Sequence, residues 1–209
     1  MTEKATPPQP LELLEPSNEL LNQRADLVRL EDIRRPETQA IIDRMFEIAY
    51  GEQGDAERKT LVGLAAPQIG INKRIILVGV NAVGLGEQPE LQAFINPVIF
   101  KQSAETEPGR EGCYSTDRVC GIVDRSVSVT VRALDRTGKA LQQTYTGFPA
   151  RVFQHEVDHL NGVRIPDRIT DDNNLHWVEL DRYGEYRHNW QNWDTLCPRE
   201  NWEAIKEGR

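Results

Sequence analysis

The chain has 209 residues, a length that suits one domain with additional segments at its ends. Its formal net charge of −8 argues against binding nucleic acid or an anionic membrane through bulk charge. No apolar run is long enough to cross a bilayer, and three cysteines without a CxxC pair argue against a disulfide scaffold and a zinc ribbon.

The N-terminal part of the chain gives the first predicted boundary. Residues 1–16 contain four prolines, which predict an extended, weakly ordered lead-in. They include no apolar stretch of signal-peptide type, so we expect a cytoplasmic protein. Pro36 then opens a helical pattern, which Gly51 and Gly54 end. The apolar face of this predicted helix consists of Ile41, Ile42, Met45, Phe46 and Ala49.

Strand signals dominate the middle of the chain. Residues 74–80 (RIILVGV) and 93–100 (AFINPVIF) predict buried strands, and Pro97 indicates a bulge or a sheet edge in the second. The segment between them is rich in turn residues and predicts a loop. Residues 126–134 alternate apolar and polar side chains, and a turn then leads to a hairpin partner at 140–146.

A predicted helix then carries the sequence FQHEVDHLNG at 153–162. Pro149 begins this helix, and Gly162 lies where it ends. Helices among antiparallel hairpins predict an α+β domain, with antiparallel strands packed around a central helix that carries this motif. All four tryptophans follow Thr170, which predicts an extension that packs over the core; docking of a partner is the alternative.

One turn of the predicted helix brings two imidazoles together. His155 and His159 point within about 40° of each other, which suits a bidentate clamp for a metal ion. Glu156 lies beside them and can take a proton from a metal-bound water. The opposite face is apolar and consists of Ala150, Phe153, Val157 and Leu160. A metal site is therefore predicted, and a solvated helix with two unimportant histidines is the alternative.

A third ligand is required, because catalytic sites keep three protein ligands and one open position. The pattern HExxHxxGxxH fails here, since its last position is Ile165. Glu179 and Glu185 are downstream candidates, and either would suit a gluzincin-like protease. Cys113, in EGCYS at 111–115, is the upstream candidate.

Three stretches together resemble the signatures of the peptide deformylase family. They are LVGLAAPQ (61–68), EGCYS (111–115) and QHEVDHLNG (154–162), in the family's order. On the matched positions, the resemblance implies that Cys113, His155 and His159 are metal ligands and that Glu156 is the catalytic carboxylate. The implied activity is removal of the formyl group from the N-formylmethionine of nascent polypeptides.

The resemblance also implies roles for residues around the ligands. Gln68 and the backbone N–H of Tyr114 would face the developing oxyanion. Gly63, Gly112 and Tyr114 would contact the substrate. The family's first motif usually begins with glycine where this chain has Leu61, and Tyr114 replaces a leucine. These departures bear on substrate preference rather than on the ligands or Glu156.

One divalent metal ion is the implied cofactor, with ferrous iron in the cell and nickel, cobalt or zinc as replacements. We expect a monomer that acts on formylmethionyl peptides. A basic C-terminal helix can dock on the ribosome in this family, and the acidic tail gives that partner only weak support here. A catalytically silent relative that binds formyl peptides is a further alternative.

The predicted organisation has three parts. Residues 1–16 form the lead-in, 17–169 the catalytic metallohydrolase domain, and 170–209 the Trp-rich C-terminal extension. Two further contacts are expected near the motif helix. Glu111 is predicted to pair with Arg125, with a surface glutamate as the alternative. Arg151 and Asp158 share a helix face, either as support for the ligands or as a solvated pair.

Overall fold

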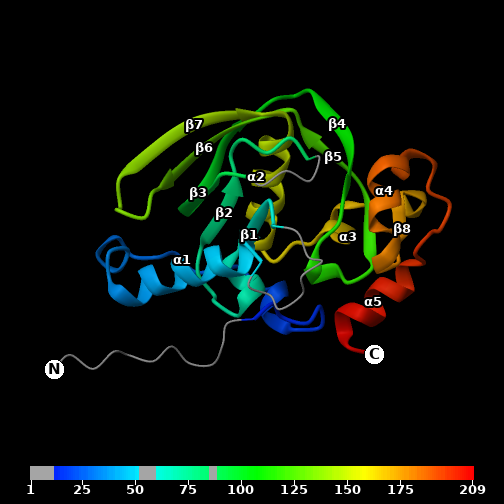
Figure 1. Ribbon diagram of the computed structural model, residues 1–209, viewed down its shortest axis with the longest axis horizontal. Helices are drawn as coiled ribbons and strands as arrows, with labels where there is room; N and C mark the ends of the chain where they lie inside the picture. The colour runs from blue at the N-terminus through cyan, green and yellow to red at the C-terminus, as the bar shows by residue number, and fades with distance from the viewer. Residues whose placement is uncertain (1–11, 52–59, 85–88) are drawn as a thin grey trace.

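The computed structural model describes residues 12–51, 60–84 and 89–209 (Figure 1). Its strands form two sheets, and every pairing between the named strands is antiparallel. The five-stranded sheet has the order β1-β2-β3-β6-β7, and the three-stranded sheet has the order β4-β5-β8. The predicted α+β class is therefore confirmed as a mixture of helices and antiparallel sheets. Most of the predicted lead-in (residues 1–11), Gly54 and residues 85–88 of the predicted loop lie outside the described residues.

The strands are β1 (Gly63–Ala65), β2 (Ile75–Gly79), β3 (Leu91–Gln102), β4 (Thr106–Glu111), β5 (Val119–Ser126), β6 (Ser128–Leu134), β7 (Ala140–Thr146) and β8 (Leu175–Trp177). The α-helices are α1 (Pro36–Ala49), α2 (Gly147–His159), α3 (Ile165–Arg168), α4 (Tyr183–Asn189) and α5 (Arg199–Glu207). Short 3-10 turns connect several of them, and those used below are η3 (Ala66–Ile69) and η4 (Tyr114–Thr116).

Helix α1 confirms the first predicted helix. Pro36 is its first residue, where the missing N–H of proline removes no helical hydrogen bond. Ile42, Met45 and Ile48 are buried, and they pack in one cluster with residues of β1 and β2. Tyr50 follows the helix, and Gly51 has φ +105°, so the chain leaves the helix where the glycine was expected to end it.

The predicted strands of the middle segment are confirmed as β2, β3, β6 and β7. The signal at Pro97 corresponds to a bulge, because the β3–β6 register shifts between Ile95 and Val98. Asn96 has φ +52° at this place. Its side-chain amide forms hydrogen bonds with both the backbone N–H and the backbone carbonyl of Val28. The edge alternative also holds locally, since the pairing of β3 with β2 ends at Ile95 and the strand pairs only with β6 beyond it.

Helix α2 is enclosed on more than its apolar side. It contacts all five strands of the larger sheet and also β5 of the smaller one. Its apolar residues Ala150, Phe153 and Leu160 join the cluster formed with Phe94 and Ile76. The opposite side, expected to be polar, is buried too, because it faces β4 and β5 rather than water. The functional side chains of α2 therefore lie inside the molecule.

The ends of α2 differ slightly from the prediction. The helix begins at Gly147, two residues before Pro149, and ends at His159. Gly162 follows three residues later with φ +71°. A Cβ at this glycine would lie 2.5 Å from the Asn22 carbonyl oxygen, so the chain requires glycine for its turn and for close packing.

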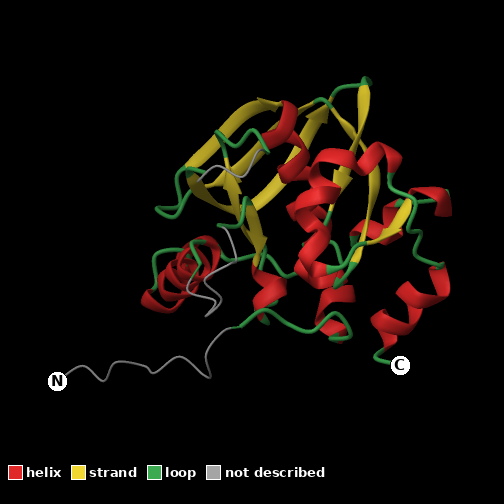
Figure 2. Cartoon of the chain, turned by 45° about the vertical axis from the view of Figure 1, so that its right-hand side comes forward, coloured by secondary structure: helices red, strands yellow, loops and turns green. Residues whose placement is uncertain are grey.

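The C-terminal segment adds β8, α4 and α5 beside β5 (Figure 1). Both views place these elements on the opposite side of the molecule from α1 (Figure 1 and Figure 2). Trp202 is 2% exposed and packs with Val119 and Ile165, and the guanidinium of Arg164 lies over its ring. Trp193 is also buried, in a second cluster. No helix in the described ranges is long and apolar enough to traverse a bilayer.

Candidate functional site

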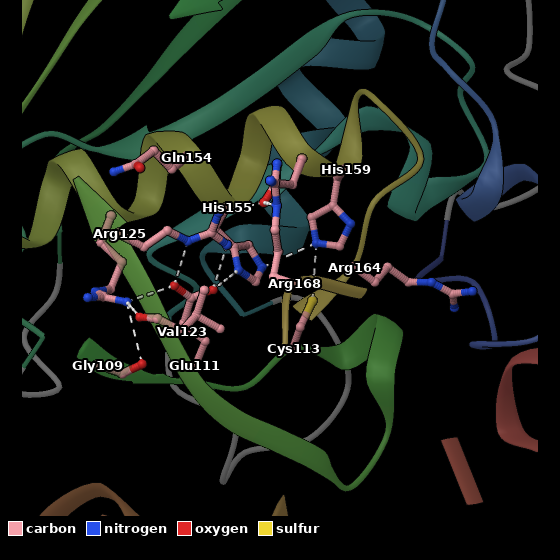
Figure 3. Close-up of polar contacts among 12 residues, drawn as sticks. Gly109, Glu111, Cys113, Val123, Arg125, Gln154, His155, His159, Arg164 and Arg168 are labelled. Carbon is pink, nitrogen blue, oxygen red and sulfur yellow. Dashed lines mark hydrogen bonds and ion pairs between the residues drawn. The ribbon is translucent and has the colours of Figure 1, made fainter. Parts of the chain in front are cut away.

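Three side chains from two distant segments meet beside α2. His155 and His159 lie one helical turn apart, with their Nε2 atoms 3.2 Å from each other. The Cys113 Sγ atom, on the chain that follows β4, lies 3.3 Å from the Nε2 of His159 (Figure 3). All three ligand atoms lie within 4.8 Å of one another. The structure thus brings together the three residues that the sequence nominated as ligands.

The two separations that involve His159 Nε2, 3.2 and 3.3 Å, fit neighbouring ligands of one tetrahedral metal ion. Metal–nitrogen bonds of about 2.1 Å and metal–sulfur bonds of about 2.3 Å place neighbouring ligand atoms about 3.3–3.6 Å apart. The ionisation state of Cys113 fits as well. Burial opposes the thiolate, but the charge of His159 and hydrogen bonds from both histidines hold the pKa of the Cys113 thiol well below its ordinary value. The thiolate is the form that binds a metal.

Glu111, the last residue of β4, fixes the orientation of His155. The His155 Nδ1 atom lies 2.9 Å from the Glu111 carboxylate, which leaves Nε2 to face Cys113 and His159. Arg125 donates two hydrogen bonds to the same carboxylate, so the predicted Glu111–Arg125 pair is confirmed. Burial alone would raise the pKa of Glu111, but the bonds from His155 and Arg125 lower it. Glu111 therefore remains ionised.

Arg151 and Asp158 support this arrangement without pairing with each other. Arg151 donates to Glu111 at 3.0 Å and to the backbone carbonyl of Val123. Asp158 accepts from Arg125 at 2.5 Å and forms a close ion pair with Arg168. Both residues are buried, so the solvated alternative is wrong. Figure 3 shows the contacts of Arg125 and His155 with Glu111.

Glu156 has a different environment. It is 4% exposed, and its Oε2 atom has no hydrogen-bond partner among the described residues. Burial raises the pKa of the Glu156 carboxyl to about 7, although the neighbouring histidines act in the opposite direction. Its other oxygen lies against β1, where a Cβ at Gly63 would approach it to 2.3 Å. Gly63 is therefore required by the close approach of β1 to this carboxyl.

Gln68 lies on the other side of the cysteine. It is buried in η3, and its side-chain Oε1 accepts from the backbone N–H of Ala65 at 2.8 Å. The amide Nε2 donates to Cys113 Sγ at 3.3 Å and to Ser115 Oγ at 3.1 Å. The bond to Ala65 fixes which end of the amide points at the ligands, so the donor end faces the site.

The two residues that flank Cys113 have different surroundings. A Cβ at Gly112 would lie 2.9 Å from Cys120 Sγ and 3.1 Å from the ring of Tyr183, so only glycine fits there. Tyr114 begins η4, and its side chain is 37% exposed. Asp117 closes the turn with φ +53°.

The remaining sequence candidates lie elsewhere. Leu61 packs with the α1 cluster, so the departure from glycine there fills the core. The Glu179 carboxylate pairs with Arg118 and that of Glu185 pairs with Arg182, and both acidic side chains are about half exposed. Neither belongs to the group of ligand atoms around His155. The gluzincin-like ligand set therefore has no support in the geometry.

Sequence reasoning missed several contacts of the site. It placed Glu111 beside Arg125 but not beside His155, and it did not connect Gln68 with Ser115. A period-2 pattern in residues 109–113 could have indicated that Glu111 and Cys113 share one face of an extended segment. The short strand contains proline and glycine, which hid this signal.

Comparison with known proteins places this site in a family. The family described as Polypeptide deformylase matches residues 10–174. The peptide deformylase of Thermotoga neapolitana is 44% identical over 128 residues, which cover 61% of this chain and 70% of that protein. The peptide deformylase of Halothermothrix orenii is 42% identical over 132 residues, covering 63% and 77%.

Solved structures agree with the sequence relatives. A class I type b peptide deformylase from Acinetobacter baumannii aligns with a TM-score of 0.68 at 32% identity, covering 76% of this chain and 98% of that chain. The peptide deformylase from Thermotoga maritima aligns with a TM-score of 0.65 at 33% identity, covering 77% and 98%. The chain therefore belongs to the polypeptide deformylase family.

Proposed function

We propose that this protein hydrolyses the N-terminal formyl group of formylmethionyl peptides, releasing formate and a free amine. The observation that carries the proposal is that Cys113, His155 and His159 meet beside Glu156, whose Oε2 atom has no hydrogen-bond partner among the described residues. Formamide hydrolysis passes through a tetrahedral anion, so the site needs a base for water and donors for the anion. This chain has candidates for both.

The metal ligands are Cys113, His155 and His159. When bound there, a divalent ion supplies Lewis acidity that polarises the formyl carbonyl and acidifies water. We propose ferrous iron in the cell, with nickel, cobalt or zinc as replacements, because a thiolate beside two imidazoles accepts several divalent metals. The Nδ1–H of His155 donates to Glu111, and this bond keeps the Nε2 atom of His155 turned toward the cysteine.

Glu156 acts as the proton carrier. Its carboxylate takes a proton from the attacking water and returns it to the nitrogen of the leaving amine. Two features suit it to this role. The Oε2 atom has no competing donor in the described part of the chain, and a carboxyl pKa of about 7 matches the basicity needed near neutral pH.

Gln68 and the backbone N–H of Tyr114 stabilise the oxyanion. The Gln68 amide is fixed by Ala65 with its N–H end toward Cys113, so little reorganisation is needed during the reaction. Tyr114 follows Cys113 directly, which keeps its backbone N–H near the ligands whatever side chain it carries. Loss of one such donor costs about 3–4 kcal/mol in comparable enzymes.

The peptide substrate enters between two sheet edges. β1 ends the larger sheet and β4 ends the smaller one, and an extended peptide can add to such edges by backbone hydrogen bonds. Gly63 on β1 lies against Glu156, and Gly112 follows β4 directly before Cys113. We therefore assign Gly63, Gly112 and Tyr114 to substrate binding. A structure of the Acinetobacter baumannii enzyme holds Met-Ala-Ser, a peptide with the expected N-terminal methionine.

The wider organisation follows from the same proposal. Residues 17–169 form the catalytic domain, with the motif helix at its centre, and residues 170–209 form an extension that packs on it through Trp193 and Trp202. The enzyme is a cytoplasmic monomer. Its negative net charge gives docking on ribosomal RNA little electrostatic support.

The first test measures release of formate from formyl-Met-Ala-Ser by protein purified and loaded with metal without oxygen. Glu156→Ala is expected to retain metal and to lose about 10²–10⁴-fold in kcat. Glu179→Ala, which removes an exposed carboxylate, serves as the matched control and is expected to keep wild-type activity. A Glu156→Ala variant with wild-type kcat would refute the assigned base.

The second test separates the ligand sets. Cys113→Ala is expected to lose the metal, whereas a gluzincin-like site built on Glu179 or Glu185 would keep it. Binding of the formyl peptide by metal-loaded wild-type protein without turnover would instead identify a silent relative.

A further inference from the structure

Helix α4 of the C-terminal segment lies against the chain that carries Cys113. Residues 110 and 112 point to the same side of the extended segment, opposite to Glu111. The Arg110 Nε donates to the Arg187 carbonyl of α4 at 3.2 Å. Two residues on, the ring of Tyr183 packs against Gly112, the residue that directly precedes the cysteine. The first residue of α4 thus touches the backbone of the site.

The hydroxyl of Tyr183 connects both sides of the turn that holds Cys113. It accepts from the Cys120 thiol on β5 at 3.1 Å and donates to the backbone carbonyl of Asp117 at 3.5 Å. Burial raises the pKa of the Cys120 thiol to about 12, so this thiol keeps the proton that it donates. The ring fixes one end of the turn at Gly112, and the hydroxyl fixes the other at Asp117.

The turn itself is held only partly by its own residues. Thr116 Oγ1 donates to the Cys113 carbonyl, and Asp117 adopts φ +53°, a conformation that disfavours residues with a side chain. A contact at the Asp117 carbonyl therefore acts on the position where the backbone is least favourable. The turn carries Cys113 and the backbone N–H of Tyr114, the groups assigned to metal and oxyanion.

We propose that Tyr183 is a positioning residue that holds the turn from Gly112 to Asp117, and with it the Cys113 sulfur, in the geometry that the site requires. The proposal rests on the proposed function only for the roles of Cys113 and the Tyr114 N–H. The family match ends at residue 174, so this contact comes from a segment beyond the matched region.

The experiment compares Tyr183→Phe with Tyr186→Phe in the full chain loaded with cobalt(II). Tyr186 is a matched control, because it lies on the same helix, is buried, and its hydroxyl forms a hydrogen bond within this segment, with His176 Nδ1 at 3.0 Å. The absorption band of the thiolate–cobalt bond reports the position of the Cys113 sulfur without substrate. kcat and KM for formyl-Met-Ala-Ser are measured on the same samples.

Tyr183→Phe is expected to shift the thiolate–cobalt band and to lower kcat about tenfold, with a smaller change in KM. Tyr186→Phe is expected to keep the wild-type band and a kcat within about twofold of wild type, because its hydroxyl does not touch the turn. A wild-type band and kcat in Tyr183→Phe, or equal shifts in both variants, would overturn the proposal. A cobalt-loaded wild-type protein that shows the band but releases no formate would instead refute the proposed function.

Discussion

Two buried glutamates lie close to the histidines of α2, and their environments differ. Glu111, on the β4 side, accepts hydrogen bonds from His155, Arg125 and Arg151. Burial opposes its ionisation, but the bonds from His155 and Arg125 lower its pKa. Glu156, on the β1 side, has an oxygen without a partner in the described ranges, and burial raises its pKa to about 7. The two acids are similarly buried. Their neighbours, rather than their depth, keep one ionised and suit the other to the proposed role of proton carrier.

Among the variants that test this difference, the one that neutralises Glu111 is expected to lose the most stability. Glu111→Gln removes the carboxylate partner of the buried Arg151 and one of the two carboxylate partners of the buried Arg125, so the free energy of unfolding should fall by about 3–5 kcal/mol. Metal affinity should weaken about 10–100-fold, because His155 loses its orienting partner. Urea denaturation and metal titration measure the two changes. Glu179→Gln, at an exposed pair, should change stability by less than about 1 kcal/mol.

Neutralising Glu156 should have the opposite effect on stability. In metal-free protein its folded pKa of about 7 lies above the ordinary 4.5, so burial favours the protonated form. Its contribution to stability is present below about pH 4.5 and is lost as the pH rises through 7. Glu156→Gln should therefore match wild type at pH 4.5 and exceed it by about 3 kcal/mol at pH 8. Urea denaturation of chelator-treated protein at both pH values tests this; equal stability at pH 8 would contradict it.

A methyl group added at Gly63, between β1 and Glu156, should lower the free energy of unfolding by a smaller amount. In Gly63→Ala the new Cβ would meet the Glu156 carboxyl and Val152, which forces one of them to move. We expect a loss of about 1–3 kcal/mol in the free energy of unfolding, together with a lower kcat. Thermal unfolding and formate release measure both. A variant with unchanged stability and kcat would show that the carboxyl is free to shift.

The smallest effect is expected at the outer end of the charged network. Arg168 is about half exposed and pairs with Asp158, which keeps Arg125 as a second partner. Arg168→Gln should therefore cost about 1 kcal/mol and leave metal affinity unchanged. A loss as large as that of Glu111→Gln would show that the network acts as one unit, and a double-variant cycle would measure the coupling.

The sequence predicted those helices and strands whose pattern lies within the element itself. Pro36 and the apolar spacing after it predicted α1, and the alternation in 126–134 predicted the β6–β7 hairpin. Strand β4 was not predicted, because Thr106–Glu111 contains Pro108 and Gly109 and has little apolar character. Its strand conformation depends on pairing with β5, which is a tertiary property.

The site shows the same division. The motifs nominated Cys113, His155 and His159, and the structure places their ligand atoms together. The contact between Glu111 and His155 could not be read from either motif, since it depends on how β4 approaches α2. The contact of Tyr183 with Gly112 was equally hidden, because α4 carries no periodic apolar pattern and its position depends on β5 and β8.

The position of the tryptophans has a practical consequence. All four lie between residues 177 and 202, in the segment that carries β8, α4 and α5. Intrinsic indole fluorescence therefore reports only on this segment, whereas far-ultraviolet circular dichroism reports on the whole backbone. Following both signals during denaturation would reveal, without any label, whether the C-terminal segment detaches before the sheets unfold.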